Sequence, residues 1–242
     1  RLVMMSDFLH ILPEVQEALK SGQAVVALES TIVAHGMPYP QNLETAQRLE
    51  SIVRAGGAVP ATVAVVDGKL QVGCTIEDLT ALATSPDVLK VSRRDLPLAL
   101  ARKKLGATTV SGTLIGCELA GIRVFATGGI GGVHRGVERT WDISADIPEL
   151  AKSSVAVVSA GAKSILDLQK TLEALETAGV TVVGYATDDF PAFFTPTSGI
   201  AAPHRVDSAR EMAAAMHAKW SLGLEGGFLI ANPIPVEFSA DP

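Results

Sequence analysis

Lys163 is the residue whose sequence setting points most directly to chemistry. It follows an apolar run and a patch of small residues in the stretch VVSAGAKSILDL, residues 157–168. Lysine is seldom buried without a partner, and partial burial at the mouth of a sheet favours the neutral amine. A neutral amine can attack a carbonyl carbon and form a Schiff base, and the small Gly161 and Ala162 would leave room for the adduct. The alternative is a surface lysine that pairs with Asp167 on a helix.

Three acidic residues lie where acid–base or metal chemistry could use them. Glu29 directly follows the apolar run AVVAL, so it is either a general acid or base or an acid at the start of a helix. Asp142 and Asp146 stand four residues apart in WDISAD. Oxygen ligands of this kind suit Mg²⁺ or Mn²⁺ with most of its water shell retained. The alternative is a loop with two unbound acids.

Three segments are suited to holding an anion. The glycine-rich run TGGIGGVHRG spans residues 127–136, KVSRRDLP begins at Lys90, and GATTVSGT contains Val110. Glycine lets backbone N–H groups approach a ligand closely, and hydroxyls, amides and a lysine make a phosphate cradle. The glycine run lacks the third glycine of a dinucleotide fingerprint, and the chain has no GxxxxGK[ST] motif. The alternatives are a flexible loop, a solvated turn and a small-residue strand with a turn.

An alternation of strands and helices must position these residues. Buried strands are predicted at residues 24–28, 122–126, 155–158, 180–185 and 228–231, and a hairpin at 62–72 around Asp67-Gly68. Helices are predicted at residues 42–55, 96–105, 164–178 and 208–220, with Asn42, Ser164 and Ser208 as N-caps. This order predicts an α/β fold with a largely parallel, mixed central sheet. We expect one domain over residues 1–242.

Bulk composition narrows the class of protein. The chain has 242 residues, 48% of them hydrophobic, with a net charge of −6. An acidic balance argues against nucleic acid as a partner. No apolar run reaches the roughly 20 residues needed to cross a bilayer, so no membrane association is expected. Cys74 and Cys117 have no metal-ligand spacing and are expected to be reduced thiols in a cytoplasmic protein, or in an organellar one after removal of a targeting segment.

Several of these strings together carry a resemblance to a known family. VALESTIVAHGMPYPQN, KVSRRDLP, ATGGIGGVHRG, DISAD, SAGAKSILDL and GLEGGFLIANPIP make the chain similar to the pseudouridine-5′-phosphate glycosidases, a family that includes indigoidine synthase A-like proteins. The resemblance runs from about Leu12 to Phe238. It implies a three-layer α/β/α fold, a homotrimer, and cleavage of pseudouridine 5′-phosphate to uracil and ribose 5-phosphate with a divalent metal, commonly Mn²⁺.

The resemblance also implies roles for individual residues. Lys163 would be the nucleophile, Glu29 the proton donor and Asp142 the metal ligand. Substrate contacts are implied at Lys90, Val110, Ser144, Ala145 and Asp146, and His134 and Thr127 would border the pocket. Members of the family continue past NPIP with a helical region that contributes an asparagine beside the base.

Three other functions fit parts of this pattern. A Schiff-base aldolase for sugar phosphates would need a lysine and a phosphate loop, but no metal at Asp142. A non-catalytic protein that binds sugar phosphates would keep the pocket and form no reducible adduct. A role in pigment biosynthesis lies within the same family.

Overall fold

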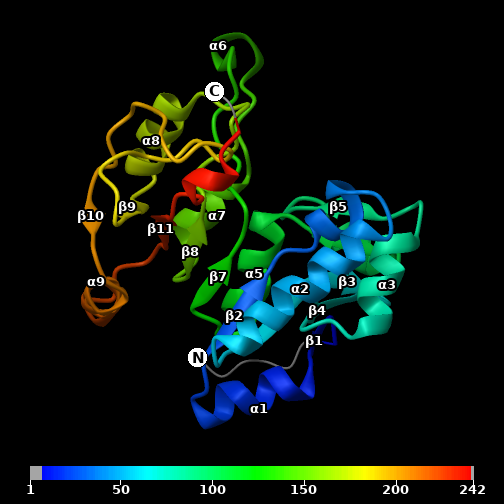
Figure 1. Ribbon diagram of the computed structural model, residues 1–242. Helices are drawn as coiled ribbons and strands as arrows, with labels where there is room; N and C mark the ends of the chain where they lie inside the picture. Colours follow the sequence, from blue (N-terminus) through cyan, green and yellow to red (C-terminus); the bar gives the residue numbers. More distant parts are fainter. Residues whose placement is uncertain (1–6, 241–242) are drawn as a thin grey trace. The chain divides into compact units, whose positions relative to one another are not determined.

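The computed structural model describes residues 7–240, and the chain divides into two compact units, residues 1–125 and 126–242 (Figure 1). Both ends of the expected single domain, residues 1–242, lie outside the described residues, and that expectation stays a prediction. Each unit is an α/β structure with its own core, so each is described by itself.

The first unit is built on a mixed sheet. Strands β1 (Leu9–Ile11), β4 (Lys69–Val72), β3 (Val59–Val66) and β2 (Val25–Leu28) lie side by side in that order. Strand β6 (Gly106–Thr108) also pairs with β3, and β5 (Leu89–Val91) pairs with β6. The β3–β4 and β3–β6 pairs are antiparallel and the other pairs are parallel.

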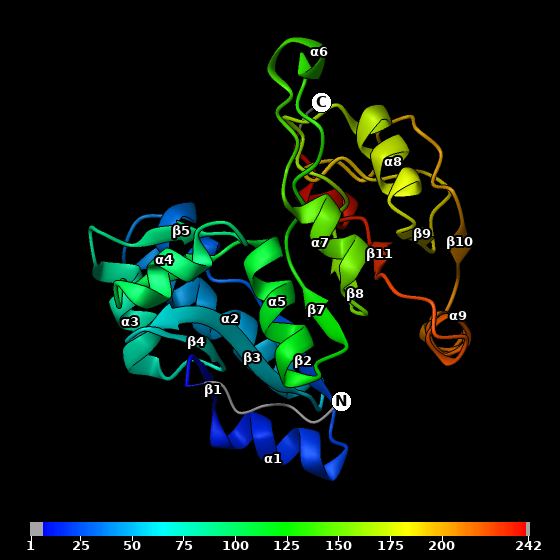
Figure 2. The ribbon, with the colours of Figure 1, turned by 180° about the vertical axis from the view of Figure 1, so that it is seen from behind.

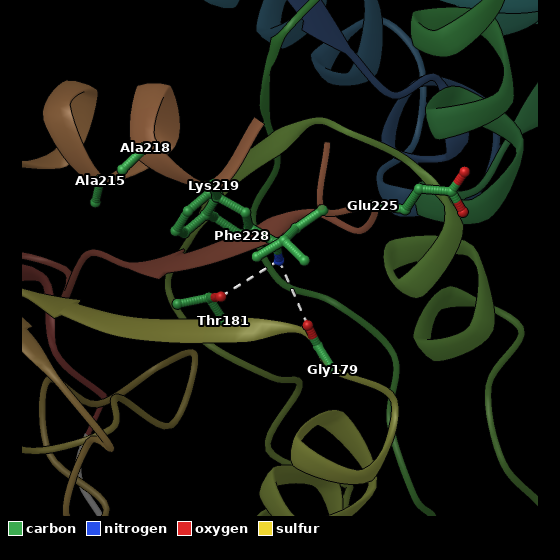
Figure 3. A pocket seen from close by; sticks show the side chains of 8 residues that line it. Gly179, Thr181, Ala215, Ala218, Lys219, Glu225 and Phe228 are labelled. Carbon is green, nitrogen blue, oxygen red and sulfur yellow. Dashed lines mark hydrogen bonds between the residues drawn. The ribbon is translucent and has the colours of Figure 1, made fainter. Parts of the chain in front are cut away.

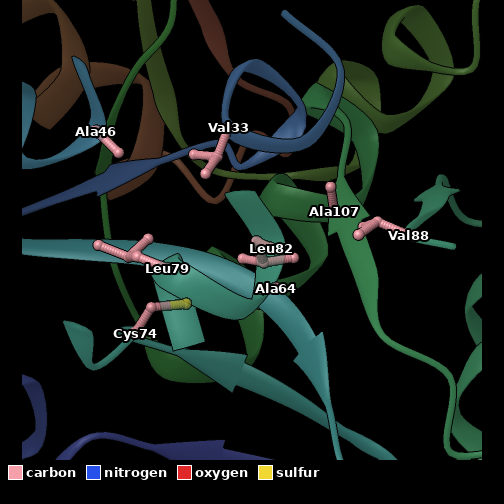
Figure 4. Close-up of a cluster of buried hydrophobic side chains, with 8 residues drawn as sticks. All are labelled: Val33, Ala46, Ala64, Cys74, Leu79, Leu82, Val88 and Ala107. Carbon is pink, nitrogen blue, oxygen red and sulfur yellow. The ribbon is translucent and has the colours of Figure 1, made fainter. Parts of the chain in front are cut away.

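Helices cover both faces of this sheet, which makes three layers. Helices α2 (Gln41–Ala55) and α3 (Ile76–Thr84) pack on the face that carries Ala64, together with the short π-helix η1 (Ile32–Gly36) (Figure 4). Helix α5 (Val110–Ala120) packs on the opposite face, where Gly116 lies against Val63 and Val72. Alternate residues of a strand point to opposite faces, which explains this division. The unit also contains α1 (Pro13–Ser21) and α4 (Leu96–Ala101).

The second unit is built on a parallel sheet (Figure 2). Strands β8 (Ala156–Ser159), β11 (Phe228–Ala231), β9 (Thr181–Tyr185) and β10 (Arg205–Val206) are neighbours in that order. Helix α9 (Ala209–Ser221) packs over the face formed by Ala156, Val183 and Phe228. Helix α8 (Leu168–Thr177) packs against β9 and against α7 (Asp146–Lys152). Strand β7 (Val124–Ala126) contains the point in the sequence at which the first unit ends and the second begins. The second unit also contains the short helix α6 (Val137–Thr140) and the 3₁₀ helix η2 (Val236–Phe238).

The predicted fold class is confirmed: the strand pairs described above are largely parallel, and the antiparallel ones, β3–β4 and β3–β6, lie in the first unit. The hairpin at Asp67-Gly68 is present, and both residues take the positive φ that this two-residue turn requires. Ser208 caps α9 as predicted, because its hydroxyl accepts a hydrogen bond from the Glu211 N–H at 3.2 Å. Short-range signals of this kind are decided by neighbouring residues.

The predicted helix start at Ser164 is wrong. Helix α8 begins at Leu168, and Asp167 is its N-cap, accepting a hydrogen bond from the Lys170 N–H. The four preceding residues are held by the glycine-rich segment: the Lys163 N–H donates to the Ile130 carbonyl at 3.1 Å and the Asp167 N–H to the Val133 carbonyl at 2.9 Å. This tertiary pairing replaces a helical turn.

Two other helix predictions need correction. Asn42 is not an N-cap; it lies inside α2, buried, and its amide donates to the carbonyls of Val33 and Ala83 at 2.7 and 3.0 Å. Helix α4 ends at Ala101 instead of Leu105, because Lys103 takes a left-handed conformation at φ 50°. Within residues 7–240, the helices lack the combination of length and apolar character that would let one cross a membrane.

Candidate functional site

In the first unit, two strands end at the middle of one long strand. The first half of β3 pairs with β2 and its second half pairs with β6, which runs in the opposite direction. The carboxyl ends of β2 and β6 therefore meet at Val63. The Ser30 hydroxyl donates to the Val63 carbonyl at 2.6 Å, and the Thr108 hydroxyl donates to the same oxygen at 2.7 Å. Strand ends that converge in this way are where α/β sheets bind ligands.

Glu29 lies at this convergence. It is half-buried between the end of β2 and the buried Ser30, and its carboxylate accepts a hydrogen bond from the Thr31 hydroxyl. The π-helix η1 begins at Ile32, so the carboxylate is placed by a strand end on one side and a helix on the other. Glu29 does not lie in the first turn of a helix, which was the alternative interpretation, because η1 begins three residues later. Thr31 was not singled out by sequence reasoning, although its hydroxyl stands two residues from an acid.

Helix α5 begins beside the same strand ends. Thr109 is its N-cap and accepts from the Gly112 N–H at 3.3 Å, and the Thr109 N–H donates to the Val91 carbonyl at the end of β5. A side chain at Gly112 would stand 2.6 Å from that carbonyl, so only glycine lets the helix start here. GATTVSGT is thus a strand followed by a helix N-terminus, whose N–H groups suit an anion. Val110, at 1% exposure, has only its backbone N–H to offer a ligand.

Lys90 stands in β5, next to that helix start. Its register partner in β6 is Ala107, its side chain is exposed, and no described residue forms a hydrogen bond or ion pair with its ammonium group. The turn that follows is organised by Asp95, which accepts hydrogen bonds from the N–H and hydroxyl of Ser92 at 3.1 and 2.7 Å. Partial desolvation raises the pKa of Asp95, but these bonds and Arg94 outweigh it and lower the pKa overall. The turn is therefore ordered, and Lys90 is left available.

In the second unit, the glycine-rich segment is packed and is not a flexible loop. Ile130 pairs with Ala162 in a parallel bridge, and Gly129, Ile130, Gly132 and Val133 are buried. A side chain at Gly132 would collide with the Thr171 hydroxyl. The glycines are needed because other segments press against this backbone.

The DISAD segment is one of those neighbours. The Asp146 carboxylate is buried and accepts a hydrogen bond from the Gly131 N–H at 2.8 Å, and the Ser144 N–H donates to the Gly132 carbonyl at 2.9 Å. The Ser144 hydroxyl accepts from the Asp146 N–H at 3.2 Å. Ala145 is the exposed N-cap residue of α7. The unit therefore brings Ser144, Ala145 and Asp146 together against the glycine-rich segment.

Lys163 lies in the segment after β8, residues 160–167, which is hydrogen-bonded to the glycine-rich segment at Ile130. It is half-buried, and its ammonium group has no ion pair or hydrogen bond with any residue in the described range. The expected alternative, a pair with Asp167, is wrong: Asp167 pairs with Lys170, with 3.0 Å between Oδ2 and Nζ. The small neighbours of Lys163 also have a reason in the packing of this segment. Gly161 and Ala162 are buried, and a side chain at Gly161 would collide with the Pro191 carbonyl oxygen.

Thr127, His134 and Asp142 complete the polar groups around this segment. The Thr127 N–H donates to the Val158 carbonyl at 3.0 Å, which places Thr127 beside the end of β8. The His134 N–H donates to the Asp142 carbonyl at 3.0 Å, and the His134 Nδ1 lies 3.8 Å from Asp142 Oδ2. Residues 7–240 contain no cluster of three or more His, Cys, Asp or Glu side chains that could hold a metal ion without further ligands. Asp142, at 63% side-chain exposure, fits a cation that keeps most of its water.

Lys219 lines a pocket between α9 and the sheet of the second unit. The pocket has a volume of about 660 Å³, and Figure 3 shows Lys219 reaching across it from α9 towards β9. The Lys219 ammonium donates to the carbonyls of Gly227 and Gly179 at 3.1 and 3.4 Å and to the Thr181 hydroxyl at 3.3 Å. Burial lowers the pKa of this lysine, and its nitrogen lies 5.0 Å from the centre of the Phe228 ring. Through these contacts Lys219 links α9 to the sheet, which is a structural role.

Both thiols are buried, as expected of structural cysteines. Burial raises the pKa of Cys74 and of Cys117 well above the ordinary thiol range, so neither is poised to act as a nucleophile.

The fold defines an α/β protein in which each unit carries polar groups at its own strand ends: Glu29 and the N-terminus of α5 in the first unit, and Lys163 and Asp146 beside the glycine-rich segment in the second. The family model of indigoidine synthase A-like proteins matches residues 14–242. The chain therefore belongs to the indigoidine synthase A-like family.

Individual relatives agree with this assignment. The chain is 61% identical to the pseudouridine-5′-phosphate glycosidase of Solibacter usitatus, over 95% of this chain and 77% of that protein. It is 58% identical to the one from Petrotoga mobilis, over 98% of this chain and 77% of that protein. The chain thus spans about three quarters of the length of these relatives.

Two solved structures share the fold. The prealnumycin C-glycosynthase in complex with ribulose 5-phosphate has a TM-score of 0.91 at 43% identity, over 98% of this chain and 76% of that one. An indigoidine synthase A-like protein from Thermotoga maritima has a TM-score of 0.89 at 33% identity, over 100% of this chain and 80% of that one. The three-layer α/β/α arrangement implied by the resemblance agrees with these neighbours.

Proposed function

We propose that this protein is an enzyme that cleaves the carbon–carbon glycosidic bond of pseudouridine 5′-phosphate, reversibly, to uracil and ribose 5-phosphate. The observation that carries the proposal is Lys163, half-buried on a strip paired with the glycine-rich segment and outside any ion pair with a described residue. Support comes from relatives that carry this activity in their names at 54–61% identity. A neighbour named as a C-glycosynthase with bound ribulose 5-phosphate supports a sugar phosphate as substrate.

The bond to be cleaved explains the need for a lysine. Ordinary glycosidases use two carboxylates, one of which protonates a leaving oxygen. In pseudouridine the leaving atom is C5 of uracil, a carbon that departs poorly as a carbanion. An amine bonded to C1′ of the sugar supplies an electron pair that can push the carbon away.

The proposed steps balance without an external oxidant or reductant. The neutral amine of Lys163 bonds to C1′ while the ring oxygen leaves C1′ and takes a proton, for which Glu29 is the donor. The Glu29 carboxylate takes the proton that the newly bonded lysine nitrogen loses and delivers it to C5 of the base, and the C1′–C5 bond breaks as the lysine nitrogen forms a Schiff base with C1′. Water hydrolyses the Schiff base, which returns the amine and releases ribose 5-phosphate. Run backwards, the same steps join the two products.

We propose that the N-terminus of α5, together with Lys90, binds the phosphate. Lys90 provides an exposed ammonium group without a partner among the described residues, and α5 provides the Val110 N–H at its first turn. Ser144, Ala145 and Asp146 are proposed as further substrate contacts, and His134 and Thr127 as residues that border the pocket.

A divalent cation, Mn²⁺ or Mg²⁺, is proposed at Asp142. The exposed carboxylate beside His134 offers a hard oxygen ligand and room for water, which suits either ion. When bound, the cation would order water and offset negative charge beside the sugar phosphate. A homotrimer is also proposed here on the resemblance alone, and a cytoplasmic location is proposed from the two free, buried thiols.

Turnover tests the proposal directly. Pseudouridine 5′-phosphate is incubated with the protein and Mn²⁺, and uracil is followed by its absorbance. We expect uracil and ribose 5-phosphate in equal amounts, loss of turnover after chelation and recovery with Mn²⁺ or Mg²⁺. Release of no uracil with either cation would overturn the proposed function, and full activity after exhaustive chelation would remove the metal from it.

A further inference from the structure

A pocket in the second unit lies at the carboxyl ends of its strands. It has a volume of about 490 Å³ and is lined by residues 126–128, 158–160 and 232–235, which follow or end β7, β8 and β11, and by Phe193, Phe194 and Phe238. Lys163 follows Ala160 by three residues, which is at most about 11 Å of chain. The backbone of Lys163 therefore lies within about 11 Å of a residue that lines the pocket.

The lining of this pocket suits an uncharged, flat group. None of its lining residues from the described part of the chain carries a charge, and three are phenylalanines. The polar side chains among them are Thr127, Ser159 and Asn232. A phosphate would find no cation here, whereas a planar heterocycle would find aromatic faces and a few hydrogen-bonding groups.

Phe193 is held in this pocket at a conformational cost. Its φ is 65°, in the left-handed region that a bulky residue rarely adopts because the conformation is strained. Its N–H donates to the Ala160 carbonyl at 3.0 Å, and its ring lies so close to Gly129 that a side chain there would collide with it. Phe194 meets the ring edge to face, with 4.4 Å between the centroids. A strained aromatic residue that is fixed on three sides is a mark of a functional position.

The segment that carries Phe193 is closed by one carboxylate. Asp189 accepts hydrogen bonds from the Ser198 and Gly199 N–H groups at 2.6 and 3.0 Å, and the Phe190 N–H donates to the Ile200 carbonyl at 2.8 Å. These bonds join the two ends of residues 189–200 and leave Phe193 and Phe194 at the tip. Asp189 is thus a positioning residue for the aromatic pair.

We propose that Phe193 is the surface against which the uracil ring stacks in this pocket. The inference rests on the proposed function, which supplies a flat uncharged base as one half of the substrate. Stacking fixes the plane of the base beside Lys163, so that C5 faces the carbon of the sugar. The base is released as a neutral ring, which an uncharged aromatic pocket accepts without an electrostatic penalty.

The reverse reaction separates the base from the sugar phosphate. Uracil and ribose 5-phosphate are varied independently, and the KM for each is measured with wild type, Phe193→Leu and Phe193→Tyr. We expect Phe193→Leu to raise the KM for uracil about tenfold or more, the scale of losing one base–aromatic stack, and to leave the KM for ribose 5-phosphate within about twofold. Phe193→Tyr keeps the ring and is expected to stay near wild type. Phe8→Leu, at an exposed phenylalanine of the first unit, is the matched control.

The outcomes distinguish this inference from the proposed function. If wild type turns over and Phe193→Leu changes neither KM, or both equally while circular dichroism shows it folded, the stacking role is overturned and the function stands. If Phe193→Leu does not fold, Phe193→Tyr decides: a tenfold rise in its KM for uracil counts against stacking and a wild-type value supports it. If wild type shows no turnover, the proposed function fails, and equilibrium dialysis with uracil decides: binding that Phe193→Leu loses supports the pocket, and its absence overturns it.

Discussion

Asp167 is bound to Lys170 and not to Lys163. Its carboxylate lies 3.0 Å from the Lys170 ammonium and accepts the Lys170 N–H at 3.1 Å. The backbone hydrogen bond from Lys170, and then its side chain, lower the pKa of Asp167, while Asp167 raises the pKa of Lys170. Lys170 is therefore held in the protonated form that cannot attack a carbonyl, and the nearby Lys163 is left without an acidic partner among the described residues.

The cap at Asp167 predicts a loss of stability on its removal. Asp167→Ala is expected to lower the free energy of unfolding by about 1 kcal/mol, whereas Asp167→Asn should cost less because its side-chain oxygen still accepts the Lys170 N–H. Since the folded pKa of Asp167 is lowered, the charge contributes stability above the unfolded value of about 3.9, and this is lost as pH falls through the folded pKa. Urea unfolding of the variants at pH 7 and at pH 3 measures both effects. Equal stabilities of wild type and Asp167→Ala at pH 7 would contradict the cap.

The close contact between Gly161 and Pro191 predicts that a side chain at position 161 lowers stability by more than the strain of its left-handed backbone. Gly161 and Gly179 have φ angles of 85° and 71°, but a side chain at Gly161 would collide with the Pro191 carbonyl, whereas Gly179 has no atom within 4 Å of the added carbon. Gly179→Ala should cost about 1–2 kcal/mol for the left-handed backbone alone. Gly161→Ala should cost a further ~1–3 kcal/mol, because a backbone carbonyl cannot move aside as a side chain can. Denaturant unfolding of the two variants compares them, and a smaller loss for Gly161→Ala would show that Pro191 does not pack as described.

Glu50 predicts a stability that falls as pH rises. This carboxyl of α2 is largely buried, and burial raises its pKa although the Thr62 hydroxyl donates to it at 2.6 Å. The folded state therefore holds its proton more tightly than the unfolded state does, so stability decreases from about pH 4.3 up to the folded pKa. Glu50→Gln keeps an acceptor for Thr62 and removes the charge.

The Glu50→Gln variant should be more stable than wild type at pH 7 and should lose that advantage in acid. Urea unfolding across pH 4–7 measures the difference, and Glu44→Gln, at an exposed glutamate of the same helix, is the control. An equal difference at every pH would show that the Glu50 charge is not the cause.

Sequence reasoning succeeded where the deciding contacts are local. The Asp67-Gly68 hairpin and the Ser208 cap are each fixed by residues within four positions, so their patterns were sufficient. The start at Ser164 failed because pairing with Ile130 and Val133, some 34 residues earlier, overrides the capping pattern. Helix α5 was not recognised because glycines such as Gly112 and Gly116 have a low helix propensity. They occur in α5 because neighbouring segments pack closely against it.

The candidate site was predicted in part for the same reason. Lys163, Glu29 and the glycine-rich segment stood out because polar or small residues directly follow apolar strands. Phe193 gave no such signal, since an aromatic residue in a loop has many uses and its left-handed backbone is set by the packed segments around it. The closure of residues 189–200 by Asp189 is likewise a tertiary contact, which the local sequence pattern does not indicate.

Glu29 predicts a loss of rate without a loss of substrate binding. Glu29→Gln keeps the shape and an acceptor for the Thr31 hydroxyl but removes the proton to be donated. We expect a fall in kcat on the order of 10²–10⁴, the usual effect of removing one general acid, with little change in the affinity for pseudouridine 5′-phosphate. Single-turnover kinetics and equilibrium binding measure the two quantities. Normal turnover by this variant would remove Glu29 from the mechanism.

Covalent trapping on Lys163 tests the central claim most directly. The protein is incubated with ribose 5-phosphate and borohydride, and the modified lysine is located by peptide fragmentation, which separates Lys163 from Lys170 in the same stretch. We predict one ribose-phosphate adduct, on Lys163, which is retained in Lys170→Ala and absent from Lys163→Ala. Lys163→Arg should not restore it, because a guanidinium stays protonated. Labelling of another lysine, or near-normal turnover by Lys163→Ala, would contradict the assignment of Lys163 as the nucleophile.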